Sequence, residues 1–478
     1  MESGEDKIPV SKSQAGPDLE NIPSSVIDTF RSGNLAGALM RAVSGVAAVK
    51  VVGAGLGFLS HVVLARVMSV GGYGNYVYAW AWVTILALFS RAGFGNLLIR
   101  YVSKFQAKEQ WGRLRGLLLR AGQYVSGLSI LIGAIGSASI YWLGKGISVG
   151  KQHTLLVVFA LLPVLTLMYL VQQGLRGLKQ VVRANVPELI VRHLTLMVLC
   201  GLLWLQLGQL SSVQAMVATI VAVGVALLVA TRWLWRGLPL GVRSAKPDFE
   251  STSWLKRGLP FLVISSMGLI QRKTDVLMLG FFVTSADVGV YGAALRVTGL
   301  IGFGLSVVNM TVTPYFSEFY TSGARQKLQK VVSLSAVAVT AFTVAAALGF
   351  FLFGGLILST FGAEYKDGYA IIVVLVVGKA VGSLVGPVAF LMMMTDHEAV
   401  ASRIEAGGAV CNILLNGILI PYLGVVGAAI ATTSTLAGRN IVFAYVVYRR
   451  MHINTTVFNT DIVEYLKVAL SIDTKSVE

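Results

Sequence analysis

The sequence predicts an all-α integral membrane protein of about twelve transmembrane helices, and three observations support this fold class. Of the 478 residues, 55% are hydrophobic and 13% are charged, and the mean hydropathy is +0.74. A soluble chain carries about a quarter charged residues, so this chain has too little polar surface for water-facing domains. Apolar runs long enough to cross a hydrocarbon core of about 30 Å recur along the chain. A soluble enzyme, a nucleic-acid-binding protein and a secreted disulfide-rich domain are therefore poor interpretations.

About twelve runs reach the length of roughly 20 apolar residues that a membrane-spanning helix needs. Glycine recurs within them, which favours close helix packing over barrel strands. The run 331–358 is long enough to contain a break near Gly354, and 404–420 is the weakest of the set. The predicted spans are 42–66, 76–99, 117–143, 153–173, 187–207, 213–231, 259–283, 291–313, 331–358, 369–393, 404–420 and 425–448.

The spans divide into two similar halves. A shift of the sequence by 215 residues places Gly74-Asn75-Tyr76 on Gly289-Val290-Tyr291, each at the start of an apolar run. Six helices in each half insert with the same orientation, which predicts a pseudo-two-fold axis along the membrane normal and a binding site between the halves. The expected organisation is a polar, disordered tail (1–40), a six-helix bundle (41–232), a linker (233–258), a second six-helix bundle (259–450) and a C-terminal tail (451–478).

The distribution of Lys and Arg predicts the orientation in the membrane. With the N-terminus in the cytoplasm, cytoplasmic connections and the C-terminal tail hold 22 Lys and Arg residues, against three on the opposite side. Both termini are therefore expected to be cytoplasmic, and the linker between the halves becomes a cytoplasmic linker.

Motifs for catalysis or cofactor binding are not found in the sequence. No G-x-x-x-x-G-K-[ST] occurs, and His397-Glu398 has no second histidine four residues on. The two cysteines, Cys200 and Cys411, lie in apolar runs and provide neither a disulfide framework nor a metal site. We expect no catalytic residue, no cofactor and no metal, so the chain is not expected to be an enzyme.

Charged residues near the middle of predicted spans are the strongest candidates for a binding site. Arg272 and Lys273 lie about 15–20 Å from either end of the span 259–283, too deep to reach water along the helix. A charge at that depth costs at least about 2.5–3.5 kcal/mol, so such residues normally face a bundle interior or a water-filled cavity. Asp275 lies three positions after Arg272 on the same helix face and can pair with it. One positive charge then remains uncompensated.

Further cations lie inside predicted spans, among them Lys50, Arg91, Arg296, Lys379 and Arg439, whereas the expected acids are only Asp275 and Glu188. Each cation taken alone has an alternative structural role, in which it binds a helix-end carbonyl or a neighbouring acid. Taken together they indicate a cavity that holds something anionic. Arg and Lys suit phosphate, Arg through its bidentate fork and Lys as a point charge. A pump for hydrophobic cations is expected to have the opposite sign of charge.

Several segments then resemble one family in order and spacing, over roughly residues 42–450. Leu64-Ala65-Arg66-Val67-Met68-Ser69, Tyr73-Gly74-Asn75-Tyr76 and Gly93-Phe94-Gly95 are similar to the opening of bacterial polysaccharide repeat-unit flippases. These flippases belong to the multidrug/oligosaccharidyl-lipid/polysaccharide exporter superfamily. The segments Trp254–Phe261, Val288–Tyr291, Gly362–Tyr365 and Leu423–Thr432 resemble later parts of the same proteins.

The resemblance implies two helical bundles around a V-shaped central cavity in the bacterial cytoplasmic (inner) membrane. It implies a flippase that moves an undecaprenyl-diphosphate-linked oligosaccharide to the outer leaflet, for O-antigen or exopolysaccharide synthesis. The expected partners are this lipid-linked oligosaccharide, the membrane, a coupling H⁺ or Na⁺, and a polysaccharide polymerase with other assembly proteins, but no nucleic acid. The expected diphosphate ligands are Arg272, Lys273, Lys50, Arg91 and Lys379, Asp275 is expected in pairing or ion coupling, and the expected glycan contacts are Asn309, Asn412, Asn416 and Gln172.

Two alternatives stay open at this point. A cation-coupled exporter of drugs or small molecules on the same fold needs carboxylates in the cavity to bind H⁺ or Na⁺ and a cationic substrate. A membrane glycosyltransferase or ligase that uses the same lipid needs a large external loop or an acidic catalytic pair. The predicted external loops are too short for the second alternative.

Overall fold

The structure is a computed structural model that describes residues 34–458. The chain divides into two compact units, residues 1–48 and 49–478. Most of the tail expected over 1–40, and the end of the C-terminal tail, lie outside the described residues. The side chains left undescribed within 34–458 are those of 34–44, 143, 251–253, 255–261, 263–265, 267, 303, 304, 307 and 310.

The described chain is helical throughout. No strand occurs within 34–458, where Met68 and Leu210 form a single isolated bridge. The helices are α2 (Asn34–Val67), α3 (Val70–Ser90), α4 (Phe94–Ala107), α5 (Trp111–Leu143), α6 (Val149–Gly177), α7 (Val181–Val186), the π-helix η2 (Pro187–Val191), α8 (Arg192–Leu207), α9 (Ser212–Gly237), α10 (Leu240–Ser244), α11 (Ser251–Phe282), α12 (Ser285–Thr321), α13 (Arg325–Ser359), the 3₁₀-helix η3 (Ala363–Gly368), α14 (Tyr369–Ser383), α15 (Val388–Met393) and α16 (Glu398–Met451).

Seven of the described helices are long and apolar enough to cross a membrane, or eight if the bent pair α3 and α4 forms one span. The all-α membrane fold is therefore confirmed, whereas the count of twelve spans stays a prediction. The span predicted at 331–358 is one continuous helix, α13, without the break considered near Gly354. The spans predicted at 404–420 and 425–448 both lie in α16, where Gly424 has a non-helical backbone (φ 55°, ψ −133°).

Local sequence explains several helix ends. α9 and α12 each begin with a capping box, in which Ser211 pairs with Gln214 and Thr284 pairs with Asp287. These side chains satisfy backbone N–H groups that the first helical turn leaves unpaired. Between α3 and α4, Gly93 takes a left-handed conformation (φ 79°), and the chain bends there by 48°.

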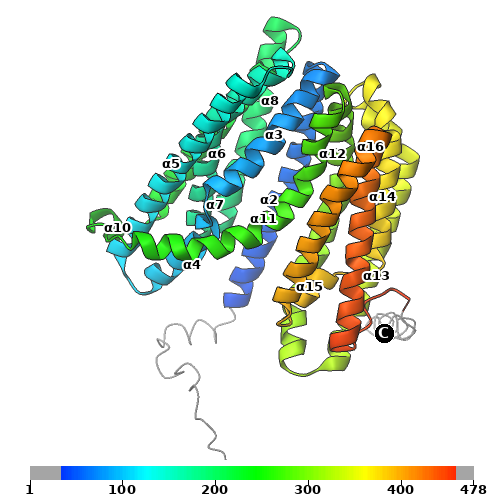
Figure 1. The fold of residues 1–478 in the computed structure, drawn as a ribbon. Coiled ribbons are helices and arrows are strands. Elements are labelled where there is room, and N and C mark those ends of the chain that lie inside the picture. The colour runs from blue at the N-terminus through cyan, green and yellow to red at the C-terminus, as the bar shows by residue number, and fades with distance from the viewer. Residues whose placement is uncertain (1–33, 459–478) are drawn as a thin grey trace, which may run out of the picture. The chain divides into compact units, whose positions relative to one another are not determined.

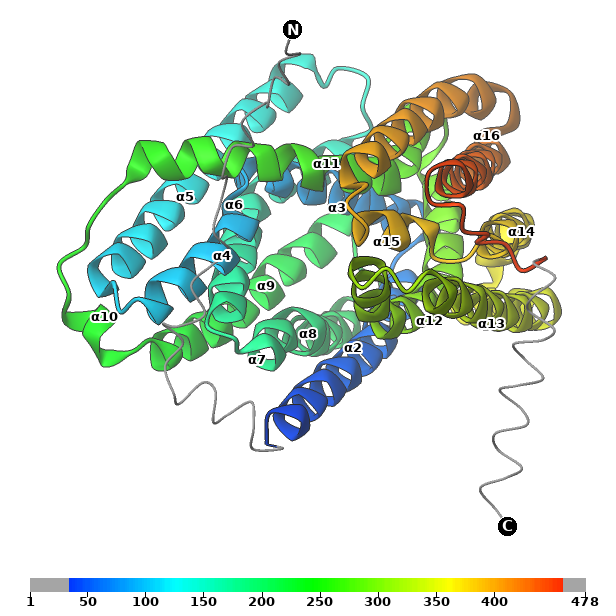
Figure 2. The same ribbon diagram turned by 90° about the horizontal axis from the view of Figure 1, so that it is seen from below.

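Helix α3 joins two groups of helices (Figures 1 and 2). The first group includes α4, α5, α6 and α9, and α3 packs against α6 and α9. The second group includes α11, α12, α13, α14 and α16, and α3 packs against α11 and α12. Within the second group, α16 packs against both α11 and α14. The α3–α12 contact is close because both helices present glycine. A Cβ on Gly74 would lie 1.7 Å from the carbonyl oxygen of Ser285, and one on Gly289 would lie 2.5 Å from that of Val70.

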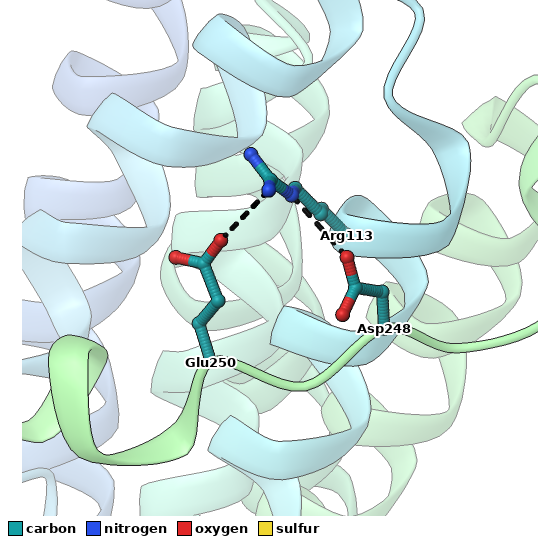
Figure 3. A network of polar contacts seen from close by, with 3 residues as sticks. All are labelled: Arg113, Asp248 and Glu250. Carbon is teal, nitrogen blue, oxygen red and sulfur yellow. Dashed lines mark hydrogen bonds and ion pairs between the residues drawn. The ribbon is translucent and has the colours of Figure 1, made fainter.

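The segment before α11 packs against α5 (Figure 3). Arg113 pairs with Asp248 at 3.3 Å and with Glu250 at 3.1 Å, and Arg115 donates to the carbonyl oxygens of Arg243 and Ala245 at 2.8 Å each. The Arg113 pairs are partly exposed, so they stabilise the contact only weakly. The segment predicted as a linker is therefore docked on the first group of helices over this stretch.

Candidate functional site

A cavity of about 960 Å³ lies among α3, α11, α12, α14, α15 and α16. One wall, from α3, is uncharged and consists of Val77, Trp80 and Ala81, which share one face of the helix. The other walls carry charged groups at Arg272, Lys273, Asp275, Arg296, Lys379, Glu398, Glu405 and Arg439. Five cations thus face three carboxylates, which leaves a formal excess of two positive charges.

Arg272 and Lys273 both line this cavity from α11. Among the described residues neither side chain forms an ion pair. Lys273 lies within electrostatic range of Arg272 and Arg296, so like charges are concentrated on this part of the wall. Such an arrangement favours an anion that approaches the three side chains together.

Asp275 does not pair with Arg272, contrary to the expectation from their spacing. The carboxylate of Asp275 is only 4% exposed. It accepts hydrogen bonds from Tyr291 at 2.9 Å, Asn416 at 3.1 Å and Thr432 at 2.5 Å. These donors come from α12 and α16, and they meet the demand of a buried carboxylate for hydrogen bonds. Arg272 is therefore left to the cavity.

Two further cations of the cavity have protein partners. Lys379 donates to the carbonyl oxygen of Thr298 at 2.7 Å. Arg439 donates to Glu405 at 2.7 Å and to Gln271 at 2.9 Å. Part of the structural role considered from the sequence thus holds for Lys379 and Arg439, although both side chains still line the cavity.

The structure places two of the expected phosphate ligands elsewhere. Lys50 does not line the cavity, and Arg91 lines a separate small pocket with Gln173 and Leu262. The guanidinium of Arg91 donates to the carbonyl oxygen of Ala87 at 3.0 Å and lies 4.8 Å from the ring centre of Tyr169. Depth in the membrane therefore selected both residues, but α2, which carries Lys50, contributes no described residue to the cavity, and Arg91 caps the end of α3 about three turns beyond the cavity-lining Trp80.

The four polar residues expected to contact a glycan also differ in their positions. Asn412 lines the cavity, and Asn416 is fully buried against Asp275. Gln172, buried in α6, and Asn309, in α12, do not line the cavity. Only Asn412 of this set is positioned to reach a ligand there.

Sequence reasoning missed Arg296 and Glu405 as cavity residues. Arg296 lines the cavity from α12 and interacts with the hydroxyl of Tyr73 on α3. Glu405 lies inside the predicted span 404–420 and was overlooked among the acids of the spans. A search of the twelve spans for every acid and base finds both residues, but only helix packing shows that they face the same space.

Hydrogen bonds between the two groups of helices lie near the ends of α2 and α13 and the starts of α3 and α12, toward the top of Figure 1, and α11 also packs against α3 and α4. Arg66 donates to the carbonyl oxygens of Thr360 at 2.7 Å and Ser359 at 2.8 Å. Ser285 donates to Asn75 at 2.7 Å. These contacts join α2 and α3 to α12 and the end of α13 at this end of the molecule.

Comparison with known proteins supports the resemblance found in the sequence. The profile of the family described as "Polysaccharide biosynthesis protein" matches residues 39–320, more than half of the chain. The chain belongs to this polysaccharide biosynthesis protein family.

One relative of this chain is the probable low-salt glycan biosynthesis flippase Agl15 of Haloferax volcanii, and the two sequences are 27% identical over 202 residues. The match covers 42% of this chain and 43% of the relative, so it spans less than half of either protein.

Two solved structures show the same fold. An inward-facing multidrug resistance MATE family transporter of the MOP superfamily matches with a TM-score of 0.70 and 16% identity, over 86% of this chain and 95% of that one. Lipid II flippase MurJ, in an inward closed conformation, matches with a TM-score of 0.68 and 12% identity, over 84% and 87%. The family member is thus a multi-pass membrane protein with the fold of MOP-superfamily transporters. These relatives are named as transporters or flippases and not as enzymes.

Proposed function

We propose that this protein is a flippase that moves a lipid-linked oligosaccharide across the membrane, and that the lipid carries its sugar through a diphosphate. The observation that carries the proposal is the positive excess of the cavity, in which Arg272 and Lys273 form no ion pair among the described residues. A diphosphate supplies the negative charge that this wall lacks. Guanidinium and ammonium groups are the side chains best suited to bind it.

The polar part of the amphipathic substrate is expected to lie in the cavity, and its lipid chain in the bilayer. The diphosphate binds at Arg272, Lys273 and Lys379, and the oligosaccharide occupies the water-filled space beside Asn412 and the uncharged α3 wall. The lipid chain stays in the bilayer, because burying it in a charged cavity forfeits its favourable hydrophobic transfer. Sequestering the charged headgroup from hydrocarbon is the task that a flippase performs.

Movement follows from alternating access between the two groups of helices. The contacts of Arg66 and Asn75 keep one end of the molecule joined. With both termini cytoplasmic, as the Lys and Arg distribution indicates, the joined end faces outward and the substrate enters from the cytoplasm. Release then requires these contacts to open while the cytoplasmic ends close.

The proposal extends to the finer features expected from the sequence. The lipid is undecaprenyl diphosphate in the cytoplasmic membrane of a bacterium, and the oligosaccharide is a repeat unit of O-antigen or exopolysaccharide. Two six-helix bundles, 41–232 and 259–450, move about a pseudo-two-fold axis along the membrane normal. Asp275 takes part in coupling to H⁺ or Na⁺. This role is supported by the burial of Asp275 and by its three hydrogen-bond donors from other helices. A polysaccharide polymerase consumes the product on the outer side.

The test replaces Arg272 and Lys273 with Gln together in cells that depend on this protein for a surface polysaccharide. We expect surface polysaccharide to be lost while the protein still inserts in the membrane, and Lys273→Arg to be milder than Lys273→Gln because it keeps the charge. Membrane abundance of each variant, measured by immunoblot, is the control for insertion. Full complementation by the double Gln variant would contradict the phosphate role of these residues.

A second candidate is a cation-coupled exporter of drugs or small molecules. The carboxylates of Asp275, Glu398 and Glu405 on the cavity walls favour it, because such an exporter needs acids to bind its ion and a cationic substrate. Uptake of a cationic dye into proteoliposomes distinguishes the two. The flippase proposal expects no ion-driven dye transport, together with translocation of a lipid diphosphate.

A further inference from the structure

Arg439 is held by an acid from another segment of its own helix. Glu405 lies before the break of α16 at Gly424, and Arg439 lies after it. The two side chains meet at 2.7 Å, and Gln271 of α11 accepts a second hydrogen bond from the same guanidinium nitrogen at 2.9 Å. The ion pair is accessible from the cavity, because the side chains of Arg439 and Glu405 are 17% and 30% exposed and both line it.

Arg272 belongs to the same charged group. Its side chain lies within electrostatic range of both Glu405 and Arg439. Glu405 is therefore a carboxylate that pairs with one guanidinium group and interacts electrostatically with a second on the wall of a cationic cavity. A phosphate that approaches these arginines meets the negative charge of Glu405, and it can take the hydrogen bond that Nη1 of Arg439 donates to Glu405 only by replacing that carboxylate.

We propose that Glu405 is an exchangeable placeholder for the phosphate of the substrate, a proposal that rests on the function proposed above. A carboxylate and a phosphate accept the same hydrogen bonds from a guanidinium group. Exchange of one for the other keeps Arg439 paired before and after binding, and it avoids the cost of a partly buried, unpaired cation. When the substrate leaves, the return of Glu405 favours release.

The exchange also makes the site selective. A neutral lipid, or one whose charge is weaker than that of a carboxylate, interacts too weakly with the guanidinium group of Arg439 to displace Glu405. The class of ligand that fits is therefore a lipid with a phosphate or diphosphate headgroup. Glu405 acts in this scheme as a positioning residue, which sets the state of Arg439 without binding the substrate.

The test measures binding of geranylgeranyl diphosphate to the purified full-length protein in nanodiscs by isothermal titration. We expect Glu405→Gln to raise the affinity about tenfold, a gain that corresponds to about 1.4 kcal/mol, and Arg439→Gln to lower it. In an Arg439→Gln background the Glu405→Gln change is expected to raise the affinity by less than half as large a factor, because the pair with Arg439 is already absent and only the interaction of Glu405 with Arg272 and the phosphate remains. Glu405→Asp keeps the charge and is expected to bind like the wild type.

Glu398 provides the matched control. It lines the same cavity from the same helix, seven positions earlier, and forms no ion pair among the described residues. Glu398→Gln removes an equal charge and is expected to change the affinity less than twofold. A second readout is translocation in proteoliposomes, where Glu405→Gln is expected to lower both the KM and the turnover rate, since binding tightens and release slows.

Two results separate the placeholder role from the proposed function. If Glu405→Gln weakens binding, or raises it equally in the Arg439→Gln background, the placeholder role is wrong. A loss of binding in the Arg272→Gln, Lys273→Gln double variant would still support the flippase in that case. If that double variant and Arg439→Gln both bind the diphosphate like the wild type, the proposed phosphate site itself is wrong.

Discussion

The glycine contact between α3 and α12 allows a direct test of alternating access. A methyl group at Gly74 would lie 1.7 Å from the carbonyl oxygen of Ser285 and 2.9 Å from the amide nitrogen of Gly289. Ordinary contact begins at 3.4 Å, and both atoms that it meets belong to the backbone, so no side chain can turn away. Gly74→Ala therefore forces α3 and α12 apart at the end of the molecule that Arg66 and Asn75 hold together.

The size of the effect follows from the cost of overpacking. An inserted methyl group in a close-packed contact costs about 1–3 kcal/mol. If that cost falls only on the joined state, the equilibrium shifts about 5- to 150-fold toward a state that is open at this end. The protein still folds, because the clash disappears once the two helices separate.

The assay follows the exposure of one cavity residue to the outside of the cell. Leu295 lines the cavity ten positions after the start of α12 at the joined end, and Leu295→Cys introduces a thiol there. The exposed Cys411 is first replaced by Ser, whereas Cys200 is buried and is left unchanged. A membrane-impermeant thiol reagent is added to whole cells, and the labelling rate is measured. We expect Gly74→Ala to raise this rate at least about fivefold.

Gly71 is the matched control, one turn earlier on the same helix. A Cβ there would lie 3.9 Å from its nearest neighbour in α12, so Gly71→Ala is expected to label at the parent rate. Equal rates for Gly74→Ala, Gly71→Ala and the parent would refute the reasoning that this contact closes the outward end.

Three further outcomes are expected. Arg91 lies outside the cavity, so Arg91→Gln should change the affinity for a lipid diphosphate less than about twofold. In the same titration, Lys379→Gln should lower the affinity at least about fivefold. A larger loss of affinity in Arg91→Gln than in Lys379→Gln would contradict the cavity as the binding site. Asp275→Asn should make translocation in proteoliposomes independent of an imposed H⁺ or Na⁺ gradient while the fold persists, and a retained gradient dependence would exclude Asp275 from coupling. Arg113→Ala should lower the free energy of unfolding by less than about 1 kcal/mol, because the ion pairs of Arg113 are partly exposed. A loss of several kcal/mol, measured by thermal unfolding, would show that these ion pairs contribute more to stability.

Composition and hydropathy were sufficient for the membrane class and for the positions of most helices. The apolar run predicted at 331–358 coincides with α13, since a run of that length has no alternative but a helix in a bilayer. The two spans predicted at 404–420 and 425–448 leave a gap at 421–424, and the structure has its break there, at Gly424, three residues after Pro421.

The candidate site was predictable in part. Depth in the membrane selected Arg272, Lys273 and Lys379, and all three line the cavity. The same criterion selected Lys50 and Arg91, which do not, because it says nothing about which helices border the cavity or how far along α3 the cavity extends.

Partners were less predictable than positions. The spacing of Arg272 and Asp275 allows a pair along one helix, but Asp275 instead accepts hydrogen bonds from α12 and α16. The pair of Glu405 and Arg439 likewise joins residues 34 positions apart in the sequence. Contacts of this kind depend on how separate helices pack, which local spacing does not determine.

One comparison of affinities tests most directly whether the cavity recognises an anionic headgroup. Binding of geranylgeranyl diphosphate and of the uncharged alcohol geranylgeraniol to the wild-type protein is measured in the same nanodiscs. We expect the diphosphate to bind at least about tenfold more tightly, and the Arg272→Gln, Lys273→Gln variant to lose this difference. Equal affinities of the wild-type protein for the two lipids would contradict this expectation.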